Sequence, residues 1–185
     1  MTAQTIILNG VSSAGKSTIA RAIQAKAERP FLHVAMDDFI SMVPSGKEFT
    51  SDWFPVQHMK VAGIELPNIG TGPKGARLLT AMRTCVSGLA DSGLDLVVDE
   101  VCEESQIADY RSRLSKSRTL FVKVGAPIRI IESREKLRGD RLIGLARAQS
   151  IKLHQNIEYD MEVDTSTDEA EDIAARILGE CGMRS

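Results

Sequence analysis

The sequence predicts an α/β fold in which helices alternate with the strands of a parallel sheet. Short apolar runs recur along the chain, and most of them are followed by a segment with helical spacing of its apolar residues. Turn-forming residues separate the segments. The length of 185 residues is close to the usual size of one domain. We therefore expect a single domain over residues 1–185, with the layers of a three-layer sandwich.

The first unit combines a strand and a helix. Thr5–Leu8 is a short apolar run followed by Asn9 and Gly10, which predicts a buried strand that ends in a turn. Lys16–Ala27 has apolar residues one turn apart, which predicts a helix, and Pro30 ends the unit.

A second strand is expected at Phe31–Met36. The adjacent carboxylates Asp37 and Asp38 come directly after it, and one of them can cap a short helix that runs through Met42. The other carboxylate is then left to face the carboxyl edge of the sheet, where ligands bind in open α/β folds.

The segment from Pro44 to Pro73 differs from the rest of the chain. It is rich in glycine and proline, which predicts a long irregular excursion, and loops of this length are usually functional. The remainder returns to the alternating pattern. The expected strands are Leu94–Val98, Thr119–Val124 and Tyr159–Val163, and the expected helices are Lys74–Ala90, Glu103–Leu114, Pro127–Leu137, Arg141–His154 and Asp168–Leu178.

Composition excludes several classes of protein. Apolar residues make up 43% and charged residues 26% of the chain, and the net charge is −2, so no general attraction to nucleic acid or to a membrane surface is expected. The three cysteines match no zinc motif. The N-terminal residues do not resemble a signal peptide, and no apolar run could span a bilayer. We therefore expect a cytoplasmic protein, and homo-oligomerisation stays open.

The strongest motif is a full match to GxxxxGK[ST] between the first strand and the first helix. In this context backbone N–H groups and the start of the helix surround phosphate oxygens, and the lysine contacts the β- and γ-phosphates. The motif predicts that the chain binds ATP. The expected nucleotide-binding residues are Gly10, Val11, Ser12, Ser13, Ala14, Gly15, Lys16, Ser17 and Thr18.

Two residues are candidate ligands for Mg²⁺. Ser17 offers the hydroxyl that phosphate-binding loops direct at the ion. Asp99 follows the strand Leu94–Val98, at the position where such proteins carry the acidic residue that orients the ion, although a solvated aspartate at a strand end is the alternative.

Asp37 is the candidate catalytic base. A carboxylate at the end of the second strand can face the γ-phosphate and accept a proton from an attacking hydroxyl. In the alternative interpretation it merely caps the next helix.

Three arginines suggest that residues 127–154 form a lid. Arg134, Arg138 and Arg141 lie close together around Gly139, so they can converge on transferring phosphates when the segment closes, together with the catalytic Lys16. The alternative is a solvated helix face. Trp53 and Phe54 lie in the 44–73 excursion and could form an apolar wall for the acceptor or pin the excursion to the core. We assign structural or surface roles to His33 and His154.

Taken together, these residues resemble the chloramphenicol phosphotransferase family. The stretches that carry the resemblance are Ile6-Ile7-Leu8-Asn9-Gly10 running into Ser12–Ser17, Asp37, Arg138-Gly139-Asp140-Arg141, Gly144-Leu145-Ala146, Gln149, His154 and Tyr159–Thr165. The resemblance implies a P-loop kinase-like fold with a five-stranded parallel sheet and a helical lid. It also implies ATP-dependent phosphorylation of a small alcohol with Asp37 as the base. Val11 stands where that family often has a second loop glycine.

Other functions stay open at this point. The chain could be a kinase of nucleotides or of another metabolite on the same fold. It could also be a switch module that binds ATP and transfers no phosphoryl group to a small molecule. Asp37 and the arginines favour a kinase, because a switch needs no acceptor base.

Overall fold

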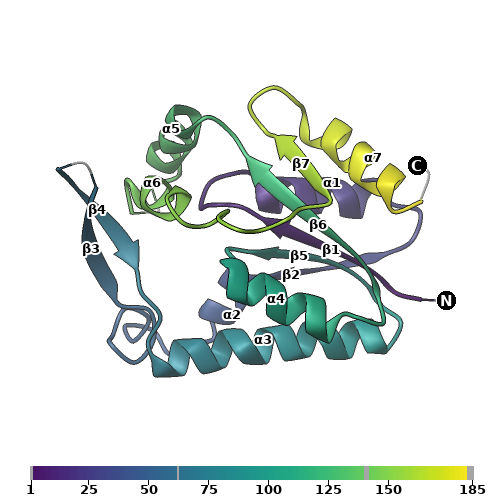
Figure 1. Ribbon diagram of the computed structural model, residues 1–185, viewed down its shortest axis with the longest axis horizontal. Coiled ribbons are helices and arrows are strands. Elements are labelled where there is room, and N and C mark those ends of the chain that lie inside the picture. Colours follow the sequence, from purple (N-terminus) through teal and green to yellow (C-terminus); the bar gives the residue numbers. More distant parts are fainter. Residues whose placement is uncertain (1, 62, 140–141, 183–185) are drawn as a thin grey trace.

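The computed structural model contains the predicted parallel sheet. Its description covers residues 2–61, 63–139 and 142–182. Five parallel strands lie in the order β2-β5-β1-β6-β7 (Figure 1). Their bounds are β1 Gln4–Asn9, β2 Phe31–Ala35, β5 Asp95–Glu100, β6 Arg118–Gly125 and β7 Met161–Asp164. This is the five-stranded parallel sheet that the family resemblance implied.

Helices cover both faces of the sheet and give a three-layer sandwich (Figure 1). The helices α1 (Lys16–Lys26) and α7 (Ala170–Glu180) cover one face, and α3 (Pro73–Asp91) and α4 (Glu104–Arg113) cover the other. Successive residues of β1 point to opposite faces: Ile6 packs with the first pair of helices and Ile7 with the second. Each fully buried isoleucine contributes about 1.5–3 kcal/mol to folding.

The predicted strands match the observed ones within a few residues at each end. The sequence pattern of the central strands was easy to recognise, because these strands are buried on both faces and therefore consist of nearly continuous apolar runs. All five strands run in the same direction, so the loops after them gather at one carboxyl edge. The helices α5 (Ile128–Arg138) and α6 (Leu145–Ser150) lie at this edge (Figure 1).

The sequence suggested that the segment between residues 44 and 73 is irregular, and this prediction was wrong for part of it. It contains an antiparallel hairpin of β3 (Val56–Val61) and β4 (Ile64–Ile69), which projects from the domain (Figure 1). Pro67 lies within β4, opposite His58. Both strands of a two-stranded hairpin are edge strands, so a residue without an N–H is tolerated there.

Two helices differ from their predictions. The short helix α2 spans Met36–Ile40, and its N-cap is Ala35, so neither Asp37 nor Asp38 caps it as expected; both carboxylates lie in its first turn. The helix expected over 141–154 is limited to α6, because Gly144 before it has a φ of 91°, a left-handed conformation that ends regular structure. Among the described residues, no helix is long and apolar enough to cross a membrane.

Candidate active site

The loop between β1 and α1 has the shape that its two motif glycines require. A Cβ on Gly10 would lie 2.3 Å from the carbonyl oxygen of Val124, so only glycine allows this approach to β6. Gly15 has a φ of 99° and faces Thr165. Ser13 also has a positive φ, 60°, and such a strained residue within a loop of this kind is typical of a functional site. Val11, which stands where the family often has a glycine, is buried in the core, so its side chain is accommodated at this position.

Lys16 extends back over the loop. Its Nζ donates to the carbonyl oxygens of Gly10 at 2.9 Å and Val11 at 3.0 Å, and lies 3.6 Å from Oδ1 of Asp99. The side chain is only 8% exposed, so its charge acts within a largely desolvated environment. A buried cation beside loop N–H groups is suited to bind phosphate oxygens.

Ser17 and Asp99 meet at the start of α1. The Ser17 hydroxyl donates to Oδ2 of Asp99 at 2.5 Å. Burial alone would raise the pKa of Asp99, but the interaction with His33, the charge of Lys16 and the Ser17 hydroxyl together lower it, so the carboxylate is ionised at neutral pH. A hydroxyl and an ionised carboxylate are oxygen ligands of the kind Mg²⁺ prefers, so these residues fit the ion.

Glu100, the other acid at the end of β5, is held by the core. Oε1 accepts from Arg83 at 3.0 Å, and Oε2 accepts from the Tyr110 hydroxyl. Burial raises the pKa of Glu100, opposed by Tyr110 and by the charge of Arg83. Because both oxygens already accept hydrogen bonds, the geometry favours Asp99 over Glu100 as the acid beside the ion.

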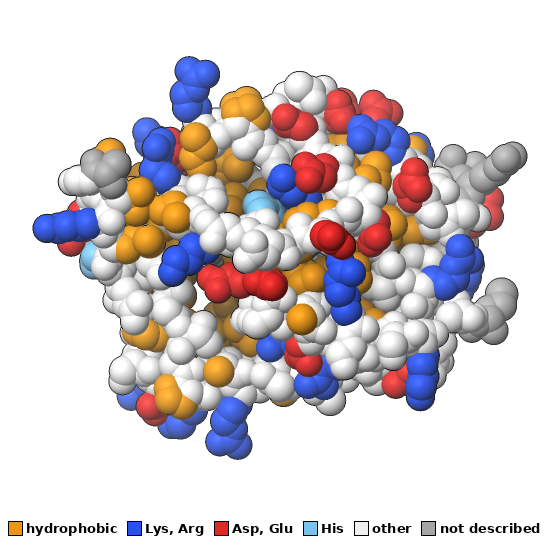
Figure 2. Space-filling view, viewed as in Figure 1, with side chains coloured by type: hydrophobic (Ala, Val, Ile, Leu, Met, Phe, Trp, Pro, Cys, Tyr) orange, Lys and Arg blue, Asp and Glu red, His pale blue; other side chains and the backbone are white. Residues whose placement is uncertain are grey.

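A cavity of about 750 Å³ runs along the carboxyl edge of the sheet. The phosphate loop lies at its middle, because β1 is the central strand. The residues after β7 and the start of α7 line one part, which we call the nucleotide half. The residues from α2 to α3 line the other, which we call the acceptor half. In Figure 2 the surface is hollowed below the hydrophobic side chains that gather over the hairpin and α6.

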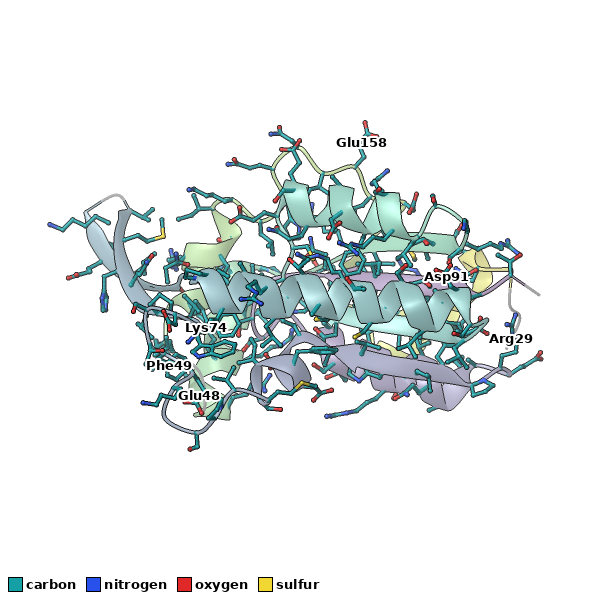
Figure 3. The ribbon with its side chains drawn as sticks, turned by 90° about the horizontal axis from the view of Figure 1, so that it is seen from below. Arg29, Glu48, Phe49, Lys74, Asp91 and Glu158 are labelled. Carbon is teal, nitrogen blue, oxygen red and sulfur yellow. The ribbon has the colours of Figure 1, made fainter. Side chains whose placement is uncertain are left out.

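The acceptor half places Asp37 beside an apolar wall. Asp37 lines the cavity from the first turn of α2, whereas Asp38 is not among the lining residues. Phe54 is buried and lines the wall, and Phe49 lines it while staying 60% exposed. Figure 3 shows Phe49 on the segment between α2 and β3, beside the start of α3 at Lys74. The remaining apolar lining residues here are Met36, Ile40, Ile69 and Leu79.

Trp53, which the sequence paired with Phe54, is not a lining residue of the cavity. Its carbonyl oxygen accepts from the N–H of Gly72 at 2.6 Å, and it would lie 2.5 Å from a Cβ on Gly75. The backbone of Trp53 thus holds the 44–55 segment against the start of α3. The structure supports the alternative role of pinning for Trp53 and leaves the apolar wall to Phe49 and Phe54.

The arginines of α5 face the same cavity. Arg134 donates to Oγ1 of Thr165 at 2.8 Å and to its carbonyl oxygen at 2.6 Å. The Thr165 hydroxyl in turn donates to the carbonyl oxygen of Ala14 in the phosphate loop at 2.9 Å. Arg138 lines the cavity one turn further along α5. Arg141, the third predicted arginine, lies outside the described residues.

The α5–α6 segment has a second contact with the phosphate loop. The Ser12 N–H donates to Oε1 of Gln149, on α6, at 2.7 Å. The fully buried carboxylate of Glu135, on α5, accepts from the N–H groups of Gly144 at 3.0 Å and Ala146 at 2.7 Å. Arg147 pairs with Glu132 through two hydrogen bonds. These contacts join α5 and α6 into one unit.

Sequence reasoning missed three residues of the site. His33 lies with its Nε2 3.8 Å from Oδ2 of Asp99, so it belongs to the site and not to the surface. Thr165 and Gln149 appeared in the sequence only as parts of the family pattern, with no role. Each acts on the phosphate loop from more than 100 residues away, and no local pattern encodes such a contact. His33 could have been found from the sequence, because it lies on the predicted strand that leads to Asp37.

Comparison with known proteins identifies the family. The model of the chloramphenicol phosphotransferase-like protein family matches residues 3–181. The chain belongs to this family. Relatives from two strains of Mycobacterium tuberculosis, each named as a candidate O-phosphotransferase, are 26% identical over 178 residues, which are 93% of this chain and 79% of theirs.

Solved structures show the same fold. A sugar kinase from Janibacter sp. HTCC2649 superposes with a TM-score of 0.66 at 19% identity, covering 99% of this chain and 96% of the other. The APS kinase CysC of Mycobacterium tuberculosis, solved with AMPPNP and APS, superposes with a TM-score of 0.65 at 14% identity, covering 98% of each chain. Family and fold together define a P-loop phosphotransferase of small molecules.

Proposed function

We propose that this protein transfers the γ-phosphoryl group of ATP to a hydroxyl of a small, uncharged molecule with an apolar body. The observation that carries the proposal is the single cavity that connects the phosphate loop with Asp37. A nucleotide on the loop and an alcohol beside Asp37 would then lie in one continuous space, which in-line transfer requires.

The reaction assigns a task to each group. Asp37 accepts the proton of the acceptor hydroxyl as its oxygen forms a bond to the γ-phosphorus. The bond between that phosphorus and the β–γ bridging oxygen breaks, and ADP leaves. Lys16, Arg134 and Arg138 offset the negative charge on the transferring group. All three line the cavity, from the phosphate loop and from α5.

Ser17 and Asp99 would hold Mg²⁺, which would supply positive charge to offset that of the phosphates. Their 2.5 Å contact places two oxygen donors at one point of the loop. His33 and Lys16 keep the pKa of Asp99 low, which favours the charged form that binds a cation.

The character of the acceptor half supports an uncharged acceptor. Among the described residues, the cations that line the cavity are Lys16, Arg134 and Arg138, and all of them belong to the phosphate loop or to α5. The described lining from α2 to α3 is mostly apolar and adds the carboxylate of Asp37. A nucleoside monophosphate or a sugar acid would meet no cation among these described residues. This favours an alcohol such as a hydroxylated antibiotic over the nucleotide-kinase alternative.

The test compares Asp37→Asn with Asp38→Asn. Labelled γ-phosphate is offered with a panel of hydroxylated antibiotics and metabolites, and transfer rate and ATP affinity are measured for both variants. We expect Asp37→Asn to lower kcat by roughly 10²–10⁴-fold, because asparagine cannot take the proton, with little change in ATP affinity. Asp38→Asn, whose residue does not line the cavity, serves as the matched control and should transfer normally.

Two outcomes would count against the proposal. Equal rates for the two variants would remove Asp37 as the base. Slow ATP hydrolysis that no acceptor stimulates would instead favour the switch module.

A further inference from the structure

The α5–α6 segment contacts the phosphate loop at two separate points. At one point Arg134 bonds to Thr165, whose hydroxyl bonds to Ala14. At the other point Gln149 accepts the N–H of Ser12. Both loop residues lie between the two motif glycines, so the two contacts bracket the part of the loop that would surround the phosphates.

The described parts of α5 and α6 are joined by hydrogen bonds. The buried carboxylate of Glu135 bridges from α5 to the start of α6 through two backbone N–H groups. Gly144, at this start, packs against β4, where a Cβ would lie 3.3 Å from Leu66. A displacement of α6 is therefore transmitted to α5, which carries Arg138.

We propose that Gln149 is a positioning residue that sets the distance between the arginines of α5 and the phosphate loop. It acts through the Ser12 N–H and not by contact with the reacting atoms. The inference rests on the proposed phosphotransfer, because it assigns Gln149 to the alignment of Arg138 with the transferring group. Charged donors must be placed within about 0.5 Å to stabilise a transition state, and a misplacement of 1 Å can cost about 100-fold in rate.

The test replaces Gln149 by methionine, which keeps the length of the side chain and removes the strong acceptor. The matched control is Gln155→Met. Gln155 lies on the turns after α6 and is exposed, and among the described contacts its side chain bonds only to the Ile151 carbonyl oxygen. We expect Gln149→Met to lower kcat by about 10–100-fold, with little change in ATP affinity and melting temperature. Gln155→Met should match the wild type.

A double-mutant cycle that combines Gln149→Met with Arg138→Lys tests whether Gln149 acts through Arg138. If Gln149 acts by placing Arg138, the double variant loses less activity than the product of the two single losses, because the second change removes an alignment already lost. The proposal would be overturned if the activity losses of the two single variants simply multiplied in the double variant. An unchanged kcat in Gln149→Met would also overturn it, as would an equal fall in its kcat and its ATP affinity.

Amide hydrogen exchange gives a readout that needs no acceptor. We expect the Ser12 amide and the amides of α6 to exchange faster in Gln149→Met than in the wild type and in Gln155→Met. If the wild type transfers phosphate to no acceptor, the proposed function fails, and the exchange data decide the positioning role alone. Unchanged exchange would overturn that role.

Discussion

At the scale of single residues, a buried network fixes the end of β1. Asn9, directly before the phosphate loop, donates from Nδ2 to the Cys102 carbonyl oxygen at 2.8 Å and to the Tyr159 hydroxyl at 2.7 Å. The same hydroxyl bonds to Nδ1 of His154 at 2.8 Å. The sequence predicted a structural or surface role for His154, and the structure assigns the structural one. It connects the end of the α5–α6 region to the start of the loop.

The network predicts acid sensitivity between pH 6.5 and 4. Burial and the charge of Lys123 lower the pKa of His154 to about 4. As the pH falls below 6.5, the unfolded chain takes up a proton at His154 that the folded protein does not, so the free energy of unfolding decreases, by up to about 1.4 kcal/mol per pH unit. His154→Gln should flatten this dependence in chemical denaturation at pH 7, 6 and 5. An equal slope in both proteins would contradict the assignment.

Residue roles differed in how well the sequence predicted them. Lys16 and Ser17 follow from a local motif, because eight consecutive residues build the loop. Asp99 follows from a strand end. Gln149 and Thr165 do not, because their contacts depend on how distant helices pack. That Phe54 lines the cavity and Trp53 does not could not be predicted either, since neighbouring aromatic residues in a loop share no periodicity.

At the scale of elements, the α5–α6 unit depends on Glu135. Its carboxylate is fully buried and accepts two backbone N–H groups that no helix bond satisfies at the start of α6. This role could not be predicted from the sequence, because Glu135 lies among the charged residues of a helix whose exposed face is also charged. The hairpin β3–β4 was missed for a related reason: Gly63 and Pro67 interrupt the alternation that marks a strand.

Glu135→Ala should therefore be strongly destabilising. It leaves the N–H groups of Gly144 and Ala146 buried without their acceptor, at about 1–3 kcal/mol each. The matched control is Glu132→Ala on the same helix, which loses only a solvent-screened pair with Arg147 and should cost much less. Urea denaturation of both variants measures the difference, and similar midpoints would contradict the role of Glu135.

At the scale of the whole molecule, the charges of the cavity are unevenly distributed. The described lining cations lie at the phosphate loop and on α5, and the described lining from α2 to α3 carries one carboxylate, that of Asp37, among mostly apolar groups. An anion bound beside Asp37 would meet no compensating cation among the described lining residues from α2 to α3. Across about 8 Å, two like charges repel by about 2 kcal/mol at an effective dielectric constant near 20.

We therefore predict selection against anionic acceptors. For two alcohols matched in shape, the neutral one should have a kcat/KM about tenfold higher than one that carries a carboxylate, and the ratio should narrow at high salt. Nucleoside monophosphates should be poor acceptors. Steady-state kinetics at low and high ionic strength test this prediction. Equal kcat/KM values for the neutral and the anionic alcohol would contradict it.

The family resemblance predicted a parallel sheet of five strands, and the observed sheet confirms it. Its topology separates the two halves of the cavity along the chain. The nucleotide side is assembled from the ends of the chain, whereas the hairpin and its flanking loops form one continuous stretch, residues 41–72, between the packed helices α2 and α3. Under the proposed phosphotransfer, replacing this one stretch by that of another family member should change which alcohol is accepted and leave the residues proposed to bind ATP unchanged.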